Sequence, residues 1–219
     1  MRLARMGNRH LSIEPCRALW CVSMKLRFPL PDGWHEYCAG CQAETVEKVA
    51  ANGREYFDCR TCGRRHERRI IIDPAVTWWV ADDGEYWHET AGVFLRDGDR
   101  FLFFERTMFP IGALTVPAGH VDAGESPEPA ALRELHEEVG WRAPRVRHVV
   151  TEDIPGDSCR RGSDAHRWHA YLTDFDPAGQ VRLNEEGVNP RWLTLDEALT
   201  GELTYPVRYL VERYRESLL

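Results

Sequence analysis

The stretch Gly119–Trp141 reads GHVDAGESPEPAALRELHEEVGW, and it decides the fold of the chain around it. Ser126 followed by Pro127 predicts a helix start with a side-chain cap, because a proline at the first helical position has no amide hydrogen that would need a partner. Gly140 predicts the end of the helix. The bulky apolar residues between these signals recur on one face at helical spacing: Leu132, Leu135 and Val139. We therefore expect an amphipathic helix here.

A second face of this helix is acidic and lies about 140° from the apolar stripe. It carries three glutamates: Glu134, Glu137 and Glu138. Carboxylates three and four residues apart repel each other and destabilise a helix by about 0.2–0.5 kcal/mol per pair. A hard divalent cation offsets this repulsion, because Mg²⁺ prefers oxygen ligands and keeps waters for substrate phosphates. Arg133 can orient one carboxylate through its planar guanidinium. An ordinary solvent-facing acidic surface is the alternative interpretation.

The stretch matches the pattern Gly-x5-Glu-x7-Arg-Glu-U-x-Glu-Glu-x-Gly-U, where U is a bulky apolar residue, at every fixed position. This pattern resembles the signature of the Nudix hydrolases. The resemblance implies an α/β fold, an α/β/α sandwich with a mixed sheet, over residues 75–219. It also implies Mg²⁺- or Mn²⁺-dependent cleavage of the pyrophosphate linkage in a nucleoside diphosphate joined to another moiety. Many members have glycine where Ala118 stands. We interpret the nearby His120 as a spectator, with a role as an acid or a metal ligand as the alternative.

The resemblance also implies roles for individual residues. The implied metal ligands are the backbone carbonyl of Gly119 and the carboxylates of Glu134, Glu137 and Glu138, with Glu138 as the principal one. Arg133 and Glu125 match positions that orient the acidic helix. Some family members take their catalytic base from this helix and others from a later loop, and in this chain Glu186, in preference to Glu185, matches the later-loop acid.

The remaining C-terminal sequence fits the same domain. A polar loop is expected over residues 152–165, and long loops in compact domains are often functional. Its paired Arg160 and Arg161 are candidates for binding substrate phosphates, with a mobile, solvated loop as the alternative. Thr194 and Glu197 have capping-box spacing before a short helix. Strands are expected at Ala75–Val80, Ala91–Leu95, Arg100–Glu105, Val146–Thr151 and His166–Phe175, and an amphipathic helix at the C-terminal end.

Two cysteine pairs precede this domain, each with two residues between its members: Cys38 with Cys41, and Cys59 with Cys62. This spacing lets a tight turn direct two thiolates at one tetrahedral Zn²⁺ ion. Asn52-Gly53 between the pairs predicts a β-hairpin. The pattern resembles a zinc ribbon over residues 35–69, in which four protein ligands make a closed, structural Zn²⁺ site. The segment Ile70–Pro74 is expected to be a linker, and Cys159 lies outside both pairs.

A zinc ribbon followed by a Nudix domain is similar in architecture to the NADH pyrophosphatases. Those enzymes carry a Ser-Gln-Pro-Trp-Trp-Pro motif after the acidic helix, whereas residues 142–147 of this chain read RAPRVR. The substrate is therefore left open among NADH, ADP-ribose, sugar nucleotides, oxidised nucleoside triphosphates and RNA 5′ ends. The alternative to an enzyme is a non-catalytic protein that senses a nucleotide through the Nudix fold and contacts nucleic acid or a partner through the ribbon.

The chain has 219 residues and a formal charge of −7, which is unevenly distributed. Residues 1–74 hold 13 basic and 9 acidic side chains, whereas residues 75–219 hold 15 and 26. The acidity argues against non-specific nucleic-acid binding by the C-terminal domain but not by the ribbon, because such binding depends on Lys and Arg. We expect a nucleotide-derived small molecule as the partner, and the sequence leaves a homodimer open.

The N-terminal segment carries no recognisable targeting signal. Residues 1–23 lack the apolar core of about 7–15 residues that a secretory signal needs, so we expect a cytoplasmic protein. No apolar run in the sequence approaches the roughly 18–20 residues that span a bilayer, so no membrane association is expected. Residues 1–34 are expected to form an extension, disordered in whole or in part, with Met24 as an alternative start to Met1.

Overall fold

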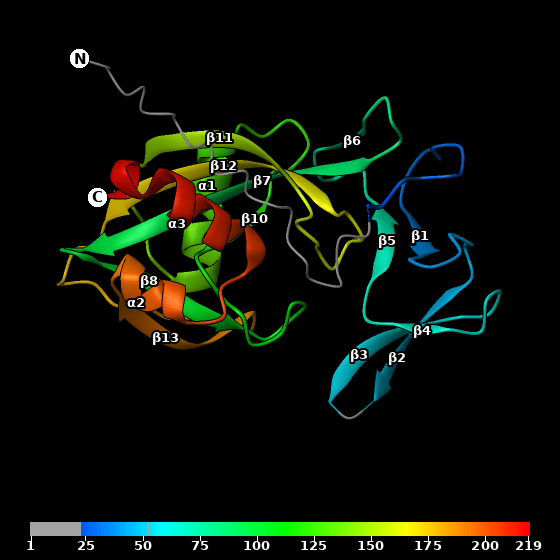
Figure 1. Ribbon diagram of the computed structural model, residues 1–219, viewed down its shortest axis with the longest axis horizontal. Helices are drawn as coiled ribbons and strands as arrows, with labels where there is room; N and C mark the ends of the chain where they lie inside the picture. The colour runs from blue at the N-terminus through cyan, green and yellow to red at the C-terminus, as the bar shows by residue number, and fades with distance from the viewer. Residues whose placement is uncertain (1–22, 52) are drawn as a thin grey trace, which may run out of the picture.

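The computed structural model describes residues 23–51 and 53–219, and the expected extension lies outside the described residues as far as residue 22. The described chain forms two modules that lie side by side in Figure 1. We call them the ribbon, residues 35–72, drawn in blue to cyan, and the sandwich domain, residues 73–219. The five strands of the ribbon are β1 (His35–Cys38), β2 (Val46–Ala51), β3 (Arg54–Cys59), β4 (Arg65–His66) and β5 (Arg69–Ile72).

The sandwich domain contains an eight-stranded sheet, in which β11, β12, β7, β8 and β13 follow one another. Short strands β6 and β10 pair with β7, and β9 pairs with β8. The strands are β6 (Trp78–Val80), β7 (Tyr86–Asp97), β8 (Arg100–Arg106), β9 (Leu114–Thr115), β10 (Ala118–His120), β11 (Arg147–Pro155), β12 (Ala165–Asp174) and β13 (Gly187–Leu193). Strand β12 runs parallel to β7, whereas β11 is antiparallel to β12, so the sheet is mixed.

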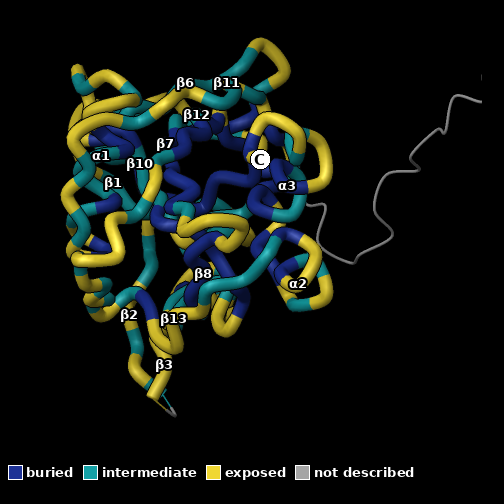
Figure 2. The backbone as a smooth tube through the Cα atoms, turned by 90° about the vertical axis from the view of Figure 1, so that its left-hand side faces the viewer, coloured by how far each residue is buried: buried dark blue, intermediate teal, exposed yellow. Residues whose placement is uncertain are grey.

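Helices cover both faces of this sheet. They are α1 (Pro127–Val139), α2 (Leu195–Thr200) and α3 (Tyr205–Leu218). Side chains alternate along β7, so that Val93 and Leu95 contact the core under α1 while Phe94 contacts the core shared with α2 and α3. Figure 2 shows the buried sheet between more exposed helices and loops. The expected α/β/α sandwich with a mixed sheet is confirmed.

The ends of the helices follow the local signals with one exception. Gly140 ends α1 in the left-handed conformation at φ 69°, as predicted. Thr194 and Glu197 form the predicted capping box at the start of α2. Ser126 is the N-terminal flanking residue of α1, but its side chain makes no capping hydrogen bond, so that part of the prediction was wrong. Pro127 at the first turn leaves one fewer amide to be capped.

The segment Ile70–Pro74 is not a linker. Its isoleucines belong to β5, which pairs antiparallel with β1, and Ile70 and Ile72 are fully buried. They form a core with Tyr86 of the sandwich domain and with Met24, which lies in the expected extension. The Tyr86 amide also donates to the Met24 carbonyl at 3.0 Å. A continuous β-branched run is typical of a buried strand, and here it joins the two modules.

The expected loop over residues 152–165 is shorter than predicted. Strand β11 continues to Pro155, whose partner on β12 is Ala165, so that residues 156–164 remain as the connection, which we call the β11–β12 loop. This loop contacts β5, since the Ile71 amide donates to the Arg161 carbonyl at 2.9 Å. Arg68 forms an ion pair of 2.6 Å with the buried Asp164. The loop is therefore tied to the ribbon side of the molecule.

Candidate functional site

The acidic face of α1 opens into a cleft of about 1360 Å³. Glu134, Glu137 and Glu138 all line it, as predicted from their spacing. Glu138 is only 5% exposed, whereas the Glu137 side chain is 55% exposed. The cleft is also lined by Tyr56 of the ribbon and by Trp34, which directly precedes the ribbon, so it lies between the two modules. The Glu134 side chain is 13% exposed. The structure thus separates a buried and a largely buried carboxylate from one that faces solvent.

Strand β10 forms a close backbone wall against these carboxylates. A Cβ atom built on Gly119 would lie less than 3.0 Å from the carboxylate of Glu134, so only glycine fits while that carboxylate keeps its place. The Ala118 amide donates a hydrogen bond of 2.8 Å to Oε2 of Glu138. Ala118 has no positive φ, which explains why the glycine of many family members is not required at this position. The backbone of β10 and both buried carboxylates therefore meet at one point.

Arg133 holds this arrangement in place. Its guanidinium donates to Glu125 Oε2 at 2.9 Å and to Glu134 Oε1 at 2.6 Å. It also donates to the carbonyl of His120 at 3.0 Å, which connects α1 to β10. A guanidinium that bridges two carboxylates and a carbonyl fixes the orientation of each of them. The expected orienting role of Arg133 and Glu125 fits this network.

Burial changes the acidity of both inner carboxyl groups. It raises the pKa of Glu134 to about 7, although the neighbouring Arg133 opposes the shift. Burial raises the pKa of Glu138 to about 8, against the effect of the hydrogen bond from Ala118. A divalent cation favours the ionised form of both groups and removes the cost of burying two negative charges together. The oxygen donors and the close approach of Gly119 therefore fit Mg²⁺ or Mn²⁺.

Glu186 and Arg160 line the same cleft, and Arg160 Nη2 lies 3.5 Å from Glu186 Oε1. Glu186 is near enough to the buried pair to raise the pKa of Glu134 and of Glu138. Arg161 also lines the cleft, but it forms an ion pair of 2.5 Å with Asp73. The structure thus brings Glu186 and Arg160 together at the predicted site, whereas the charge of Arg161 already has a partner.

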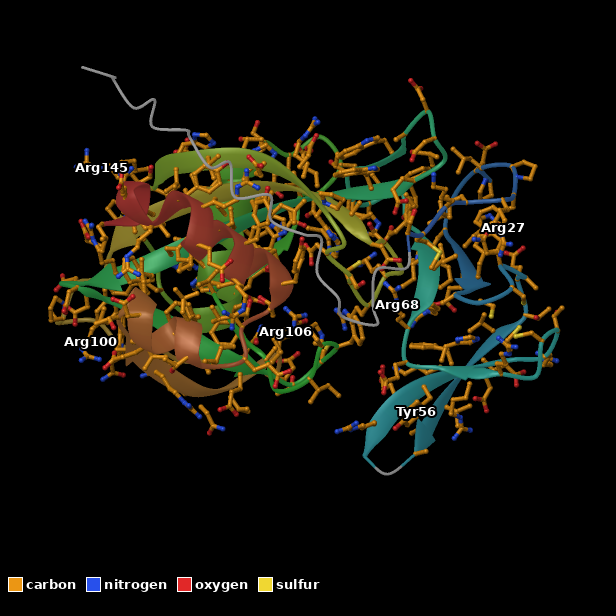
Figure 3. The ribbon with its side chains drawn as sticks, viewed as in Figure 1. Arg27, Tyr56, Arg68, Arg100, Arg106 and Arg145 are labelled. Atoms are coloured by element: carbon orange, nitrogen blue, oxygen red, sulfur yellow. The ribbon has the colours of Figure 1, made fainter. Side chains whose placement is uncertain are left out.

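Arg106 is a cleft residue that the sequence analysis did not identify. It ends β8 and donates from Nη2 to the carbonyl of Phe109 at 3.2 Å. Its Nε atom is buried and has no hydrogen-bond partner among the described residues. Figure 3 shows Arg106 on the side of the sandwich domain that faces the ribbon, where Tyr56 is labelled. An arginine at the end of a strand carries no sequence signal of its own, and only the fold places it beside Glu138.

The four cysteines of the ribbon converge as their spacing predicted. Cys38 Sγ lies 3.7 Å from Cys62 Sγ, and Cys41 Sγ lies 3.6 Å from Cys59 Sγ. A tetrahedral Zn²⁺ ion with bonds of 2.3 Å has sulfur–sulfur separations of about 3.8 Å. The Gly40 amide donates to Cys38 Sγ at 3.3 Å, which stabilises a thiolate. The cluster fits a closed Zn²⁺ site with four sulfur ligands.

A second group of metal-ligating side chains lies beside the cleft. It consists of His88, His120, Cys159 and His166, and we call it the His/Cys cluster. Sequence analysis missed it, because its members come from four separate segments of the chain and show no regular spacing. His120 was the one member that the sequence analysis considered as a ligand, and it was interpreted there as a spectator.

Comparison with known proteins identifies the sandwich domain. The NUDIX domain family matches residues 87–214, which is more than half of the chain. This chain therefore belongs to the NUDIX domain family. Within the described residues no helix is long and apolar enough to cross a membrane.

Two curated relatives illustrate the range of similar proteins. Bis(5′-nucleosyl)-tetraphosphatase [asymmetrical] of Rattus norvegicus is 36% identical over 88 residues, which cover 38% of this chain and 57% of that protein. NAD-capped RNA hydrolase NudC of Stutzerimonas stutzeri is 26% identical over 183 residues, covering 82% of this chain and 56% of that protein. The second match is longer than the sandwich domain, so it includes residues before it. The chain spans little more than half the length of either relative.

Solved structures share the fold of the sandwich domain. A MutT protein from Methanosarcina mazei Go1 superposes with a TM-score of 0.52 and 18% identity, over 59% of this chain and 94% of that chain. A MutT NUDIX hydrolase from Burkholderia pseudomallei superposes with a TM-score of 0.51 and 24% identity, over 59% of this chain and 98% of that chain. At these identities the comparison bears on the fold alone, and it supports the Nudix fold of the sandwich domain.

Proposed function

We propose that this protein is a divalent-metal-dependent hydrolase that cleaves the pyrophosphate linkage of a nucleoside diphosphate joined to another moiety. The observation that carries the proposal is the pair formed by the buried carboxylate of Glu138 and the largely buried carboxylate of Glu134, both held against the β10 backbone at Ala118 and Gly119 in a large cleft. Burying two carboxylates together is unfavourable unless a cation accompanies them. A noncatalytic nucleotide-binding protein has no need of this arrangement.

The residues around the acidic face of α1 have two kinds of role in this proposal, metal binding and positioning. The carboxylates of Glu134 and Glu138 and the carbonyl of Gly119 would hold Mg²⁺ or Mn²⁺, with Glu137 at the solvent side. When bound, the metal lowers the pKa of water and neutralises charge on the phosphates. Arg133 is a positioning residue, since its guanidinium is engaged by Glu125, Glu134 and the β10 backbone. Ala118 positions Glu138 through its amide.

The cleft also supplies groups for the substrate. Arg106 and Arg160 line the same cleft and add positive charge there, where substrate phosphates would lie. Phe109 also lines the cleft and can contact a base or another flat group. Glu186 is the candidate to accept the proton of the attacking water, because it lies in the cleft and borders Arg160. In this proposal Arg160 binds phosphate, and Arg161 keeps its pairing with Asp73.

A substrate panel tests the proposal. The purified chain is incubated with Mg²⁺ and ADP-ribose, NADH, a dinucleoside tetraphosphate, a sugar nucleotide, an oxidised nucleoside triphosphate and a 5′-capped RNA. Products are separated by ion-exchange chromatography. We expect Mg²⁺-dependent release of a nucleoside monophosphate from at least one diphosphate-linked compound. If none is hydrolysed while one binds tightly, the enzyme proposal fails and the nucleotide-sensing alternative is favoured.

A further inference from the structure

The His/Cys cluster joins four elements at one point. His88 lies on β7, His120 ends β10, His166 lies on β12 and Cys159 lies in the β11–β12 loop. One ligand atom from each residue lies within 4.8 Å of the others. The proposed function above does not use any of these side chains, and His120 was expected to be a spectator.

The sheet itself brings the three imidazoles to one face. His166 is the register partner of His88 on the neighbouring parallel strand. His120 pairs with Thr90, which lies two residues beyond His88 on β7 and therefore on the same face of the sheet. The ring centroids of His88 and His120 are 4.7 Å apart. The convergence is thus fixed by rigid strands and does not depend on a loop conformation alone.

The hydrogen bonds around His88 determine which of its nitrogens is free. Its Nε2 atom lies 2.8 Å from the hydroxyl of Tyr86, and that hydroxyl donates to the Ile71 carbonyl at 2.7 Å. A tyrosine hydroxyl has one hydrogen, so it must accept from Nε2–H of His88. The Nδ1 atom then carries a lone pair, and it lies 3.6 Å from Cys159 Sγ. A tetrahedral Zn²⁺ site has nitrogen–sulfur separations of about 3.5 Å.

His166 is held in the same way. Its Nδ1 atom lies 3.0 Å from the carbonyl and 3.1 Å from Oδ2 of the buried Asp157. Both are acceptors, so Nδ1 carries a hydrogen and Nε2 is the nitrogen left to act as a ligand. Against the effect of burial, the Asp157 carboxylate raises the pKa of His166 to about 10, so a metal ion bound at Nε2 displaces a proton from this ring. The same Oδ2 accepts a hydrogen bond of 2.8 Å from Trp168 Nε1, which fixes the carboxylate. Metal-ligating histidines usually donate their second nitrogen to a carboxylate or a carbonyl in this manner.

His120 provides an independent indication. Its Nε2 atom is buried and has no hydrogen-bond partner among the described residues. An unsatisfied buried polar atom costs about 1–3 kcal/mol, so a polar atom left in this state in the interior calls for a partner. A cation at the centre of the cluster satisfies this nitrogen together with the lone pairs of the other two rings. Three nitrogen ligands and one sulfur ligand suit Zn²⁺.

We propose that the His/Cys cluster binds one Zn²⁺ ion, separate from the ribbon zinc and from the divalent metal of the carboxylate site. Four protein ligands make the site closed, and its role is structural. Binding releases the one proton that Cys159 and His166 share in the metal-free cluster, and it joins the β11–β12 loop to three strands. This loop carries Arg160 into the cleft. Gly119 and His120 are neighbours in the sequence, and Gly119 belongs to the carboxylate site while His120 belongs to the His/Cys cluster. The ion therefore fixes one wall of the cleft.

Metal content tests the proposal. The full chain and its variants are produced with added zinc, desalted and analysed by elemental mass spectrometry. We expect two zinc ions per chain in the wild type and one in Cys159→Ala and in His166→Ala. The control His148→Ala, which changes an exposed histidine outside the cluster, retains two, and Cys41→Ser loses the ribbon ion alone. One zinc per wild-type chain, or two in both cluster variants, overturns the proposal.

A second measurement needs no variant and therefore holds even if the variants do not fold. X-ray absorption at the zinc edge of the wild-type protein reports the average ligands of all zinc present. One site with four sulfurs and one with a single sulfur average to about 2.5 sulfurs and 1.5 nitrogens per zinc. This average supports the proposal. A spectrum with four sulfurs and no imidazole scattering overturns it and leaves the cluster as a metal-free group of hydrogen-bonded side chains.

Discussion

The carboxylate of Glu134 occupies the space in which a side chain of residue 119 would stand, less than 3.0 Å from an ideal Cβ position. Glycine at this position is therefore a packing requirement of the candidate metal site. The contact joins α1 to β10, and it places a backbone carbonyl and a buried carboxylate within reach of one cation.

Gly119→Ala is expected to displace Glu134 and to lower activity by about 100-fold, because small misplacements of positioned groups have large effects on rate. The reaction rate and the Mg²⁺ dependence of one hydrolysed substrate measure the effect. Gly201→Ala is the matched control, since Gly201 has a negative φ of −88° and its new Cβ meets the flexible end of Leu114. Equal losses in the two variants would contradict the assigned role of Gly119.

Arg133→Lys is expected to lower activity by about 10–100-fold while the chain stays folded. Lysine keeps the charge but cannot donate to Glu125, Glu134 and a carbonyl together in the planar arrangement of a guanidinium. Half-maximal activity should need a higher Mg²⁺ concentration, because Glu134 loses its orientation. A magnesium titration of activity measures this shift. Arg213→Lys on α3 serves as the control, and an unchanged titration in Arg133→Lys would refute the positioning role.

Glu138→Gln is expected to stabilise the protein at high pH in magnesium-free buffer. The pKa of Glu138 is raised to about 8 from its ordinary 4.5, so the folded chain binds this proton more tightly than the unfolded chain. Stability in the absence of metal therefore falls as pH rises between these values. Glutamine removes the titration, and its side-chain oxygen can still accept from Ala118. We expect the variant to be more stable than the wild type by about 4 kcal/mol at pH 8, and by less than about 1 kcal/mol near pH 5.

Urea denaturation of the wild type and of Glu138→Gln at pH 5 and pH 8 measures this difference in the free energy of unfolding. The wild type should regain the lost stability when Mg²⁺ is added at pH 8, whereas the variant should gain less. A difference between the chains that does not change with pH would show that the Glu138 carboxyl is not the titrating group.

Cys41→Ser is expected to release the ribbon zinc and to unfold the ribbon, since small modules of this kind depend on their metal. Hydrogen exchange should become fast in β2 and β3, while the central strand β7 of the sandwich domain stays protected. Thr61→Ala changes a residue between the second cysteine pair that offers no ligand atom, and it should retain both the metal and the protection. Persistent protection of β2 in Cys41→Ser would contradict a structural role for the ion.

The sequence predicted those parts of the fold and site that depend on local spacing. The acidic face of α1 and the Gly140 helix end follow from residues close together in the sequence. The convergence of the cysteine pairs follows from the two-residue spacing within each pair. The pairing of β5 with β1 was missed, because Ile70–Ile72 as a run does not say which strand will be its neighbour. The partner strand lies more than thirty residues earlier.

The His/Cys cluster shows the same limit more sharply. His88 and His166 become neighbours only through the parallel register of β7 and β12, and nothing near either residue indicates that pairing. Arg106 reaches the cleft in the same way, through the position of β8 in the sheet. Register and strand order are set by the packing of the whole domain, so residues that depend on them are not visible in a local pattern.

The central claim is that the buried carboxylates of α1 support metal-dependent hydrolysis. Its most direct test compares the rates of wild type, Glu138→Gln and the control Glu212→Gln, an exposed glutamate on α3, with one diphosphate-linked nucleotide at saturating Mg²⁺. We predict a loss of at least about 100-fold in Glu138→Gln, with folding intact, and an unchanged rate in the control. A Glu138→Gln rate equal to that of the wild type, or hydrolysis that does not need a divalent metal, would contradict the claim.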